Sequence, residues 1–278
     1  MKALENVWDL VGQFTKNPKY VEISNLAIES WIDKLKEVEI KNEALPPKVS
    51  NDIELLEYEL IARAINYCYW YGSSKIRPCG ANAWAMYDVL NEVYDPSGVD
   101  VIPNLISALS LSRFPLMSER SSHLMELLYT DYKMVAVQLY DARDDLEDCL
   151  ESVLVYPGYA NDMFLKRASL FFMQVARKSD MFKSQVDMLP VPADYQIPKM
   201  LEHMGILQYS DELKNIIDEG ILIPSGSLME CEIRASMIAA CKTLCEKSGK
   251  NPSVVDYWLW LNRKSCDNNF HLTITTDY

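Results

Sequence analysis

Glycine-rich phosphate loops are absent from this sequence. It has nine glycines in 278 residues, and neither G-x-G-x-x-G nor G-x-x-x-x-G-K occurs, which excludes the commonest nucleotide-cofactor folds. Basic residues are also scarce, because 27 Lys and Arg stand against 40 Asp and Glu and leave a net charge of -13. This charge opposes attraction to a phosphate backbone, so we expect a small-molecule ligand and no polynucleotide partner.

Disulfide, zinc and membrane signals are lacking too. The seven cysteines are an odd number, no Cys-x-x-Cys pair occurs, and Cys241 and Cys245 have no histidine at metal-ligand spacing. No apolar run reaches the roughly 18 residues that cross a bilayer, and the N-terminus lacks an apolar signal region. We therefore expect a cytoplasmic monomer with no metal, no cofactor and no membrane partner.

Most of the chain has the period of amphipathic helix, since apolar residues recur every three or four positions. No hairpin dipeptide separates alternating runs, and only 270–275 has the pattern of an extended segment. We predict an all-α fold in a single domain, 1–278, with 1–50 as an N-terminal helical layer and 51–278 as the body that carries the site. The predicted helices cover 7–36 with a break near Asn17-Pro18, 53–70, 81–93, 102–109, 118–150, 164–175, 211–219, 229–247 and 253–262.

Several residues are candidate helix boundaries. Asn51 or Asp52, Asn161 or Asp162, and Ser227 are predicted N-caps, and Gly220 is a predicted stop. Residues 156–159 are predicted to form a turn, and the acidic run 141–148 is predicted to be a solvated face.

The proline-rich segment 189–200 organises the chain. Its three prolines stiffen the backbone on both sides of Asp194 and Tyr195, which favours presentation of these side chains. Asp194 also suits the N-cap of a helix that ends near Gly205. From the local sequence alone, capping is the favoured role for Asp194, because capping aspartates far outnumber catalytic ones.

Two further clusters, the aromatic residues at 66–70 and the basic pair Lys166 and Arg167, each have a structural and a functional interpretation. The aromatic residues at 66–70 are predicted to end a helix, where they either pack in the core or form the wall of a pocket for a planar ligand, with Asn66 as a polar reader of a base edge. Lys166 and Arg167 near a helix start oppose the macrodipole unless an anion binds there, although ordinary surface bases are the commoner explanation.

Five short motifs together resemble one family. Ala-Asp-Tyr-Gln-Ile-Pro at 193–198 is similar to the Ala-Asp-Tyr-Arg-Val-Pro signature of the queuosine salvage proteins, the queuosine 5′-phosphate N-glycosylases. Asn-Tyr-Cys-Tyr-Trp at 66–70 resembles that family's Asn-Phe-Cys-Phe-Trp, and the Lys-Arg-Ala, Glu-Ile-Arg-Ala and Leu-Trp words at 166–168, 232–235 and 259–260 also match. The matches occur in the family's order across most of the chain.

This resemblance implies a helical body related to helix-hairpin-helix DNA glycosylases, and hydrolysis that frees the 7-deazaguanine base queuine from its ribose 5′-phosphate. Asp194 is then the expected catalytic carboxylate, because cleavage of an N-glycosidic bond passes through an oxocarbenium-like transition state. The expected substrate-binding residues are Asn66, Tyr69, Trp70, Asp162, Lys166 and Tyr195. Lys166 is the candidate for the 5′-phosphate.

Three positions depart from the family pattern. Arg63 stands where the family has an acidic residue, Gln196 replaces the Arg of the signature, and His271 alone remains of a histidine pair. These changes leave open another base or an unphosphorylated nucleoside as the substrate. The rival function is a non-catalytic helical protein that binds a modified base or nucleotide, whereas a DNA glycosylase is disfavoured by the net charge of -13.

Overall fold

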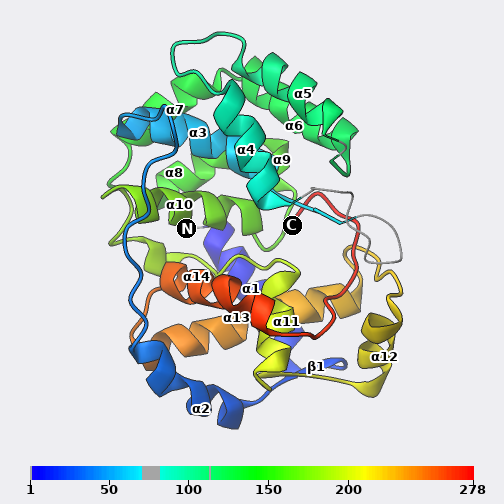
Figure 1. The fold of residues 1–278 in the computed structure, drawn as a ribbon. Coiled ribbons are helices and arrows are strands. Elements are labelled where there is room, and N and C mark those ends of the chain that lie inside the picture. The colour runs from blue at the N-terminus through cyan, green and yellow to red at the C-terminus, as the bar shows by residue number, and fades with distance from the viewer. Residues whose placement is uncertain (1, 71–81, 113) are drawn as a thin grey trace. The chain divides into compact units, whose positions relative to one another are not determined.

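A computed structural model describes residues 2–70, 82–112 and 114–278. Fourteen α-helices occur in these ranges, together with two short 3-10 helices and one two-stranded sheet (Figure 1). The predicted all-α class is confirmed. None of the helices in these ranges is both long enough and apolar enough to cross a membrane.

The described chain forms two compact units, each assembled from separate segments. Unit 1 comprises residues 1–41, 163–169 and 186–275, and unit 2 comprises 42–162, 170–185 and 276–278. The helix α10 (Lys166–Lys178) begins in unit 1 and continues in unit 2. The expected single domain, with its division near residue 50, stays a prediction.

Unit 1 is built around α13 (Leu228–Ser248), whose buried residues lie on nearly every side, as expected of a helix surrounded by others. The elements that contact it include α1 (Lys2–Lys16), α2 (Asn25–Lys36), α11 (Gln196–His203), α14 (Pro252–Asn262) and β1 (Val21–Ile23). The helix α1 packs against α13 (Figure 1), and its buried residues are Leu4, Val7 and Val11. This apolar stripe has the helical period that the sequence predicts.

A small sheet and a short helix complete unit 1. Strand β1 pairs antiparallel with β2 (Leu207–Tyr209), with Val21 opposite Tyr209, and α12 (Asp211–Glu219) follows β2. The carboxylate of Glu232 on α13 accepts the backbone N–H groups of Lys19, at 3.0 Å, and of Tyr20, at 2.6 Å, just before β1 begins. The Glu-Ile-Arg-Ala motif therefore starts with a residue that fixes the backbone of the sheet.

Unit 2 is built around α3 (Asp52–Ala64), in which every residue from Leu55 onward is buried. It packs against α6 (Met117–Tyr129) and α7 (Tyr132–Asp141), and α4 (Ala83–Val93), α5 (Val101–Leu111), α8 (Leu146–Val153) and α9 (Pro157–Ala160) surround these helices. Within α3, the buried Arg63 and Glu59 form an ion pair at 2.8 Å. The ammonium of Lys178 adds a second cation to Glu59 at 3.2 Å, which balances the buried carboxylate.

Most predicted helix boundaries are confirmed. The side chain of Asn51 caps α3, and Ser227 caps α13. The helix α12 ends at Gly220, whose φ of 69° is the left-handed conformation that favours glycine. The exposed carboxylates of the acidic run confirm the predicted solvated face, and Asp145 in that run caps α8.

Three boundary predictions are wrong. The helix predicted over 118–150 is three helices, because the side chains of Asp131 and Asp145 cap new helices within it. The turn predicted at 156–159 is the start of the one-turn helix α9. Neither Asn161 nor Asp162 stands at the N-cap position of the next helix, since α10 begins only at Lys166, after Leu165 takes a left-handed φ of 54°.

Candidate active site

The residues predicted to form the site belong to both units. Lys166, Asp194 and Tyr195 lie in unit 1, whereas unit 2 contributes Asn66, Tyr69, Trp70 and Asp162.

Asp194 lies in the proline-rich segment, two residues before α11 begins at Gln196. One carboxylate oxygen, Oδ1, accepts the backbone N–H groups of Gln196 at 2.7 Å and of Ile197 at 2.9 Å. The predicted capping role of Asp194 is thus confirmed. The second oxygen, Oδ2, makes no hydrogen bond to the residues that the structure describes, and the side chain is partly exposed. A carboxylate held by one oxygen leaves the other available to a ligand.

The backbone before Asp194 is fixed by Arg234 on α13. The Nε of Arg234 donates a hydrogen bond to the carbonyl oxygen of Ala193 at 3.1 Å, and its guanidinium pairs with Glu230 at 3.4 Å. The guanidinium also lies 4.7 Å from the centre of the Phe164 ring. Arg234 is fully buried, so this contact orients the peptide that carries Asp194. The third residue of Glu-Ile-Arg-Ala therefore supports the Ala-Asp-Tyr signature.

Tyr195 is buried and packs on the C-terminal tail. Its ring centre lies 4.9 Å from that of Phe270. The predicted extended tail continues to Leu272, which forms an isolated parallel β-bridge with Leu222. Between Phe270 and Leu272, His271 is fully buried, and this burial together with the positive charge of Arg234 lowers its pKa to about 3. His271 is therefore neutral near pH 7 and is not a proton donor there.

Lys166 lies near a helix start, as the sequence predicts, since it is the first residue of α10, and only 4 % of its surface is exposed. Arg167 follows it and is buried as well, and the first turn contains no acidic residue. Cations at the positive end of a helix are disfavoured by the helix dipole. An anion bound there is favoured by the dipole and also by these cations. This placement is compatible with phosphate binding by Lys166.

The aromatic segment 66–70 is not helical, contrary to the prediction, because α3 ends at Ala64. The guanidinium of Arg120, on α6, donates hydrogen bonds to the backbone carbonyls of Ile65, Tyr67 and Cys68, and its Nε donates to Pro115 at 2.8 Å. The carbonyls of the segment thus bond to the Arg120 side chain and not to the N–H groups that a helix would supply. The sequence also predicts Gly72 as the stop of this helix, and Gly72 lies outside the described residues.

Cys68 gives this segment an unusual backbone. Its φ is 36°, in the region that non-glycine residues rarely adopt. Its N–H donates to the backbone oxygen of Tyr278 at 2.9 Å, while its carbonyl accepts from Arg120 at 3.0 Å. Contacts from two distant parts of the chain thus hold the segment in a conformation that its local sequence does not favour.

The predicted base-binding residues of unit 2 are all buried. Asn66 is 8 % exposed, Tyr69 5 %, and Trp70 and Asp162 1 % each. Burial raises the pKa of Tyr69 to about 12, although Arg120 and Arg63 oppose the rise, so its hydroxyl stays protonated near neutral pH. The segment thus offers aromatic faces and neutral polar groups, which suit a planar base.

Comparison with known proteins agrees with these motifs. The family model for queuosine salvage proteins matches residues 99–276, which is more than half of the chain. The chain belongs to the queuosine salvage protein family. The matched range contains Asp162, Lys166, Asp194 and Tyr195, whereas the segment 66–70 precedes it.

Relatives named queuosine 5′-phosphate N-glycosylase/hydrolase match this family member over different lengths. The protein of Schizosaccharomyces pombe is 22% identical over 84% of the chain and 83% of the relative, and that of Sphaerobacter thermophilus is 24% identical over 83% and 84%. The protein of Dictyostelium discoideum is 34% identical over 27% of the chain, and this match spans only about a quarter (25%) of the relative. The similarity is therefore long but weak, with a shorter region of higher identity.

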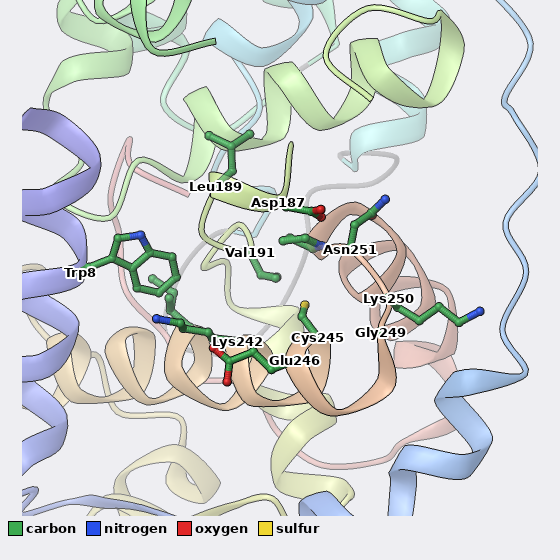
Figure 2. Close-up of a pocket in the computed structure, with 12 residues that line it drawn as sticks. Trp8, Asp187, Leu189, Val191, Lys242, Cys245, Glu246, Gly249, Lys250 and Asn251 are labelled. Carbon is green, nitrogen blue, oxygen red and sulfur yellow. The ribbon is translucent and has the colours of Figure 1, made fainter. Parts of the chain in front are cut away.

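A pocket of about 490 Å³ lies in unit 1 of this family member (Figure 2). Leu189 and Val191 of the proline-rich segment line it, but Asp194 does not. Figure 2 shows Lys242 reaching toward Trp8, and its ammonium lies 4.6 Å from the centre of the Trp8 ring. Burial raises the pKa of the Cys245 thiol in this pocket to about 12, so it is not a thiolate nucleophile. The pocket is thus separate from the predicted catalytic residue.

No group of three or more His, Cys, Asp or Glu side chains suited to a metal occurs in the part of the chain that the structure describes. The expectation of a metal-free site stays a prediction.

The sequence did not predict the contacts of Arg120 with the segment 66–70 or of Phe270 with Tyr195. Arg120 stands in a polar stretch that has the pattern of an ordinary helix start, so local sequence gives no signal for its burial. The alternating pattern at 270–275 indicates an extended tail but does not identify Phe270 as a partner of Tyr195.

Proposed function

We propose that this protein hydrolyses the N-glycosidic bond of queuosine 5′-monophosphate or a closely related 7-deazaguanine nucleotide. Water adds its oxygen to the anomeric carbon of the ribose, the bond to the base breaks, and the base leaves with a proton as free queuine. The sugar product is ribose 5-phosphate. Family membership supports this proposal, as do the names of the relatives.

The observation that carries the proposal is the geometry of Asp194. Its Oδ1 is fixed by two backbone N–H groups, whereas Oδ2 has no partner among the described residues. A carboxylate fixed in this way stabilises positive charge that develops on a sugar ring, without having to reorganise during the reaction. A capping role alone would need only the first oxygen.

The other predicted residues take the remaining parts of the nucleotide in this proposal. Lys166 binds the 5′-phosphate by charge, and Asn66, Tyr69, Trp70 and Asp162 surround the base. Tyr195 lies next to Asp194 and contacts the substrate beside the sugar.

The test is to incubate the purified protein with queuosine 5′-monophosphate, with and without EDTA, and to separate the products by chromatography. We expect queuine and ribose 5-phosphate in equal amounts under both conditions. Activity that disappears with EDTA and returns with a divalent metal contradicts the metal-free mechanism. Binding without release under any condition supports the rival function, a non-catalytic protein that holds a modified base or nucleotide.

A further inference from the structure

The hydroxyl of Tyr69 differs from those of three other tyrosines in unit 2, Tyr58, Tyr94 and Tyr159. Tyr58 hydrogen-bonds Asn91 at 2.7 Å, Tyr94 donates to the carbonyl of Glu54 at 3.0 Å, and Tyr159 donates to that of Leu60 at 2.7 Å. The Tyr69 hydroxyl is buried as well, but it has no hydrogen-bond partner among the residues that the structure describes.

A buried hydroxyl without a partner destabilises the folded protein, because it has lost its hydrogen bonds to water. Phenylalanine would fill the same space without this cost. The hydroxyl therefore does not stabilise the fold, and its presence is better explained by a role in binding.

The ring of Tyr69 is held firmly, so its hydroxyl has little freedom to seek another partner. The Arg120 guanidinium lies 5.1 Å from the ring centre, and the Phe114 ring packs edge-on at 6.2 Å. The backbone on its N-terminal side is fixed by Arg120 and by the hydrogen bond between Cys68 and Tyr278. Since the hydroxyl stays protonated near neutral pH, it is preorganised as a hydrogen-bond donor.

We propose that Tyr69 is a specificity-determining residue whose hydroxyl donates a hydrogen bond to an acceptor on the edge of the bound base, a ring carbonyl or ring nitrogen. This inference rests on the proposed function, because it takes the base of that nucleotide as the ligand. It adds a polar contact to a residue that otherwise supplies only an aromatic face. The stability lost in the free protein is recovered when the ligand binds.

The test compares the variants Tyr69→Phe and Tyr94→Phe with the parent protein. Thermal midpoints are measured without ligand, and the dissociation constant for free queuine is measured by titration calorimetry. Tyr94→Phe is the matched control, because it removes a hydroxyl in the same unit that does have a partner.

We expect opposite signs for the two properties of Tyr69→Phe. Its midpoint without ligand rises by a few degrees, and its affinity for queuine falls about two- to tenfold, the effect of one neutral hydrogen bond. Tyr94→Phe should lower the midpoint and leave the affinity unchanged.

The other outcomes separate this inference from the proposed function. If the parent releases queuine but Tyr69→Phe binds it as tightly as the parent, or is less stable, the inference is wrong and the function stands. If Tyr69→Phe binds queuine more weakly but the parent cleaves no nucleotide, the function is wrong and the inference stands. If the parent binds neither queuine nor its nucleotide, both are overturned.

Discussion

Asp194 has a capping role in the structure and a catalytic role in the proposed function, which the sequence alone presents as alternatives. Its Oδ1 satisfies N–H groups at the start of α11, and its Oδ2 is left for a ligand. Because the two roles use different oxygen atoms, evidence for the cap is not evidence against catalysis. A substitution that preserves one oxygen and changes the charge separates them.

We expect Asp194→Asn to keep the thermal midpoint and the affinity for queuine while lowering kcat by about two powers of ten or more. The amide oxygen of Asn still accepts the N–H groups of Gln196 and Ile197, whereas the negative charge is lost. Single-turnover rates and thermal midpoints on one preparation measure both effects. Asp211→Asn, at the exposed start of α12, is the control, and a stable Asp194→Asn protein with parental turnover removes Asp194 from the mechanism.

Lys166→Ala should raise KM for the 5′-monophosphate by about one to two powers of ten, because a charge-assisted contact to phosphate is worth roughly 1.5 to 3 kcal/mol. The unphosphorylated nucleoside should be affected little. Steady-state kinetics with both substrates measures the difference. An equal loss for the two substrates indicates a structural role for Lys166.

Lys242→Ala provides the matched control for the phosphate contact, since this lysine lies in the separate pocket with Trp8. We expect its KM for both substrates to equal that of the parent. A selective loss for the monophosphate in Lys242→Ala instead of Lys166→Ala would place the phosphate in that pocket.

At the scale of elements, the segment 66–70 depends on Arg120 because it belongs to no helix or strand. One buried guanidinium donates hydrogen bonds to four backbone carbonyls, which would otherwise lose these donors. A planar fork with five donors is suited to this task, and a lysine ammonium cannot reach all four acceptors. The backbone path of the aromatic segment is therefore fixed by a residue of α6.

Arg120→Lys should lower the free energy of unfolding by about 2 to 4 kcal/mol, because several carbonyls of a buried segment lose charged donors. Affinity for queuine should fall as well, since Tyr69 and Trp70 lose their support. Denaturant unfolding and calorimetry measure the two effects. Arg143→Lys is the control, because the Arg143 side chain donates its hydrogen bond to the nearby Tyr140 carbonyl. An Arg120→Lys protein as stable as this control contradicts the assigned role.

At the scale of the whole molecule, buried His271 makes stability depend on pH. The folded protein protonates it only near pH 3, because its pKa is lowered to about 3, whereas the unfolded chain does so near the ordinary pKa of 6.5. Between these values the unfolded state binds more protons, so stability is present above pH 6.5 and decreases as the pH falls toward 3. The steepest slope from one such group is about 1.4 kcal/mol per pH unit.

We expect His271→Gln to be less sensitive to acid than the parent over this range. Unfolding free energies measured at intervals between about pH 7 and the acid limit of the fold test the expectation. His203→Gln, an exposed histidine at the end of α11, should behave like the parent. Identical acid dependence in the parent and His271→Gln would mean that His271 does not contribute.

The sequence by itself determined the helical class, most helix boundaries and the family. Caps such as Asn51 and Ser227 act on N–H groups a few residues away, and Gly220 acts on the helix that it ends, so their effects are local. The period of apolar residues is local too. The motifs at 193–198 and 232–235 identified the family because their order along the chain was informative.

Only the tertiary structure decided where α3 ends, how 66–70 runs and what supports Asp194. Arg120 contacts carbonyls more than fifty positions earlier in the chain, and Arg234 contacts Ala193 across about forty. Such contacts override local helix propensity, because leaving a buried carbonyl or guanidinium without a partner costs more than losing a turn of helix. The pattern of neighbouring residues does not encode which distant side chain supplies the partner.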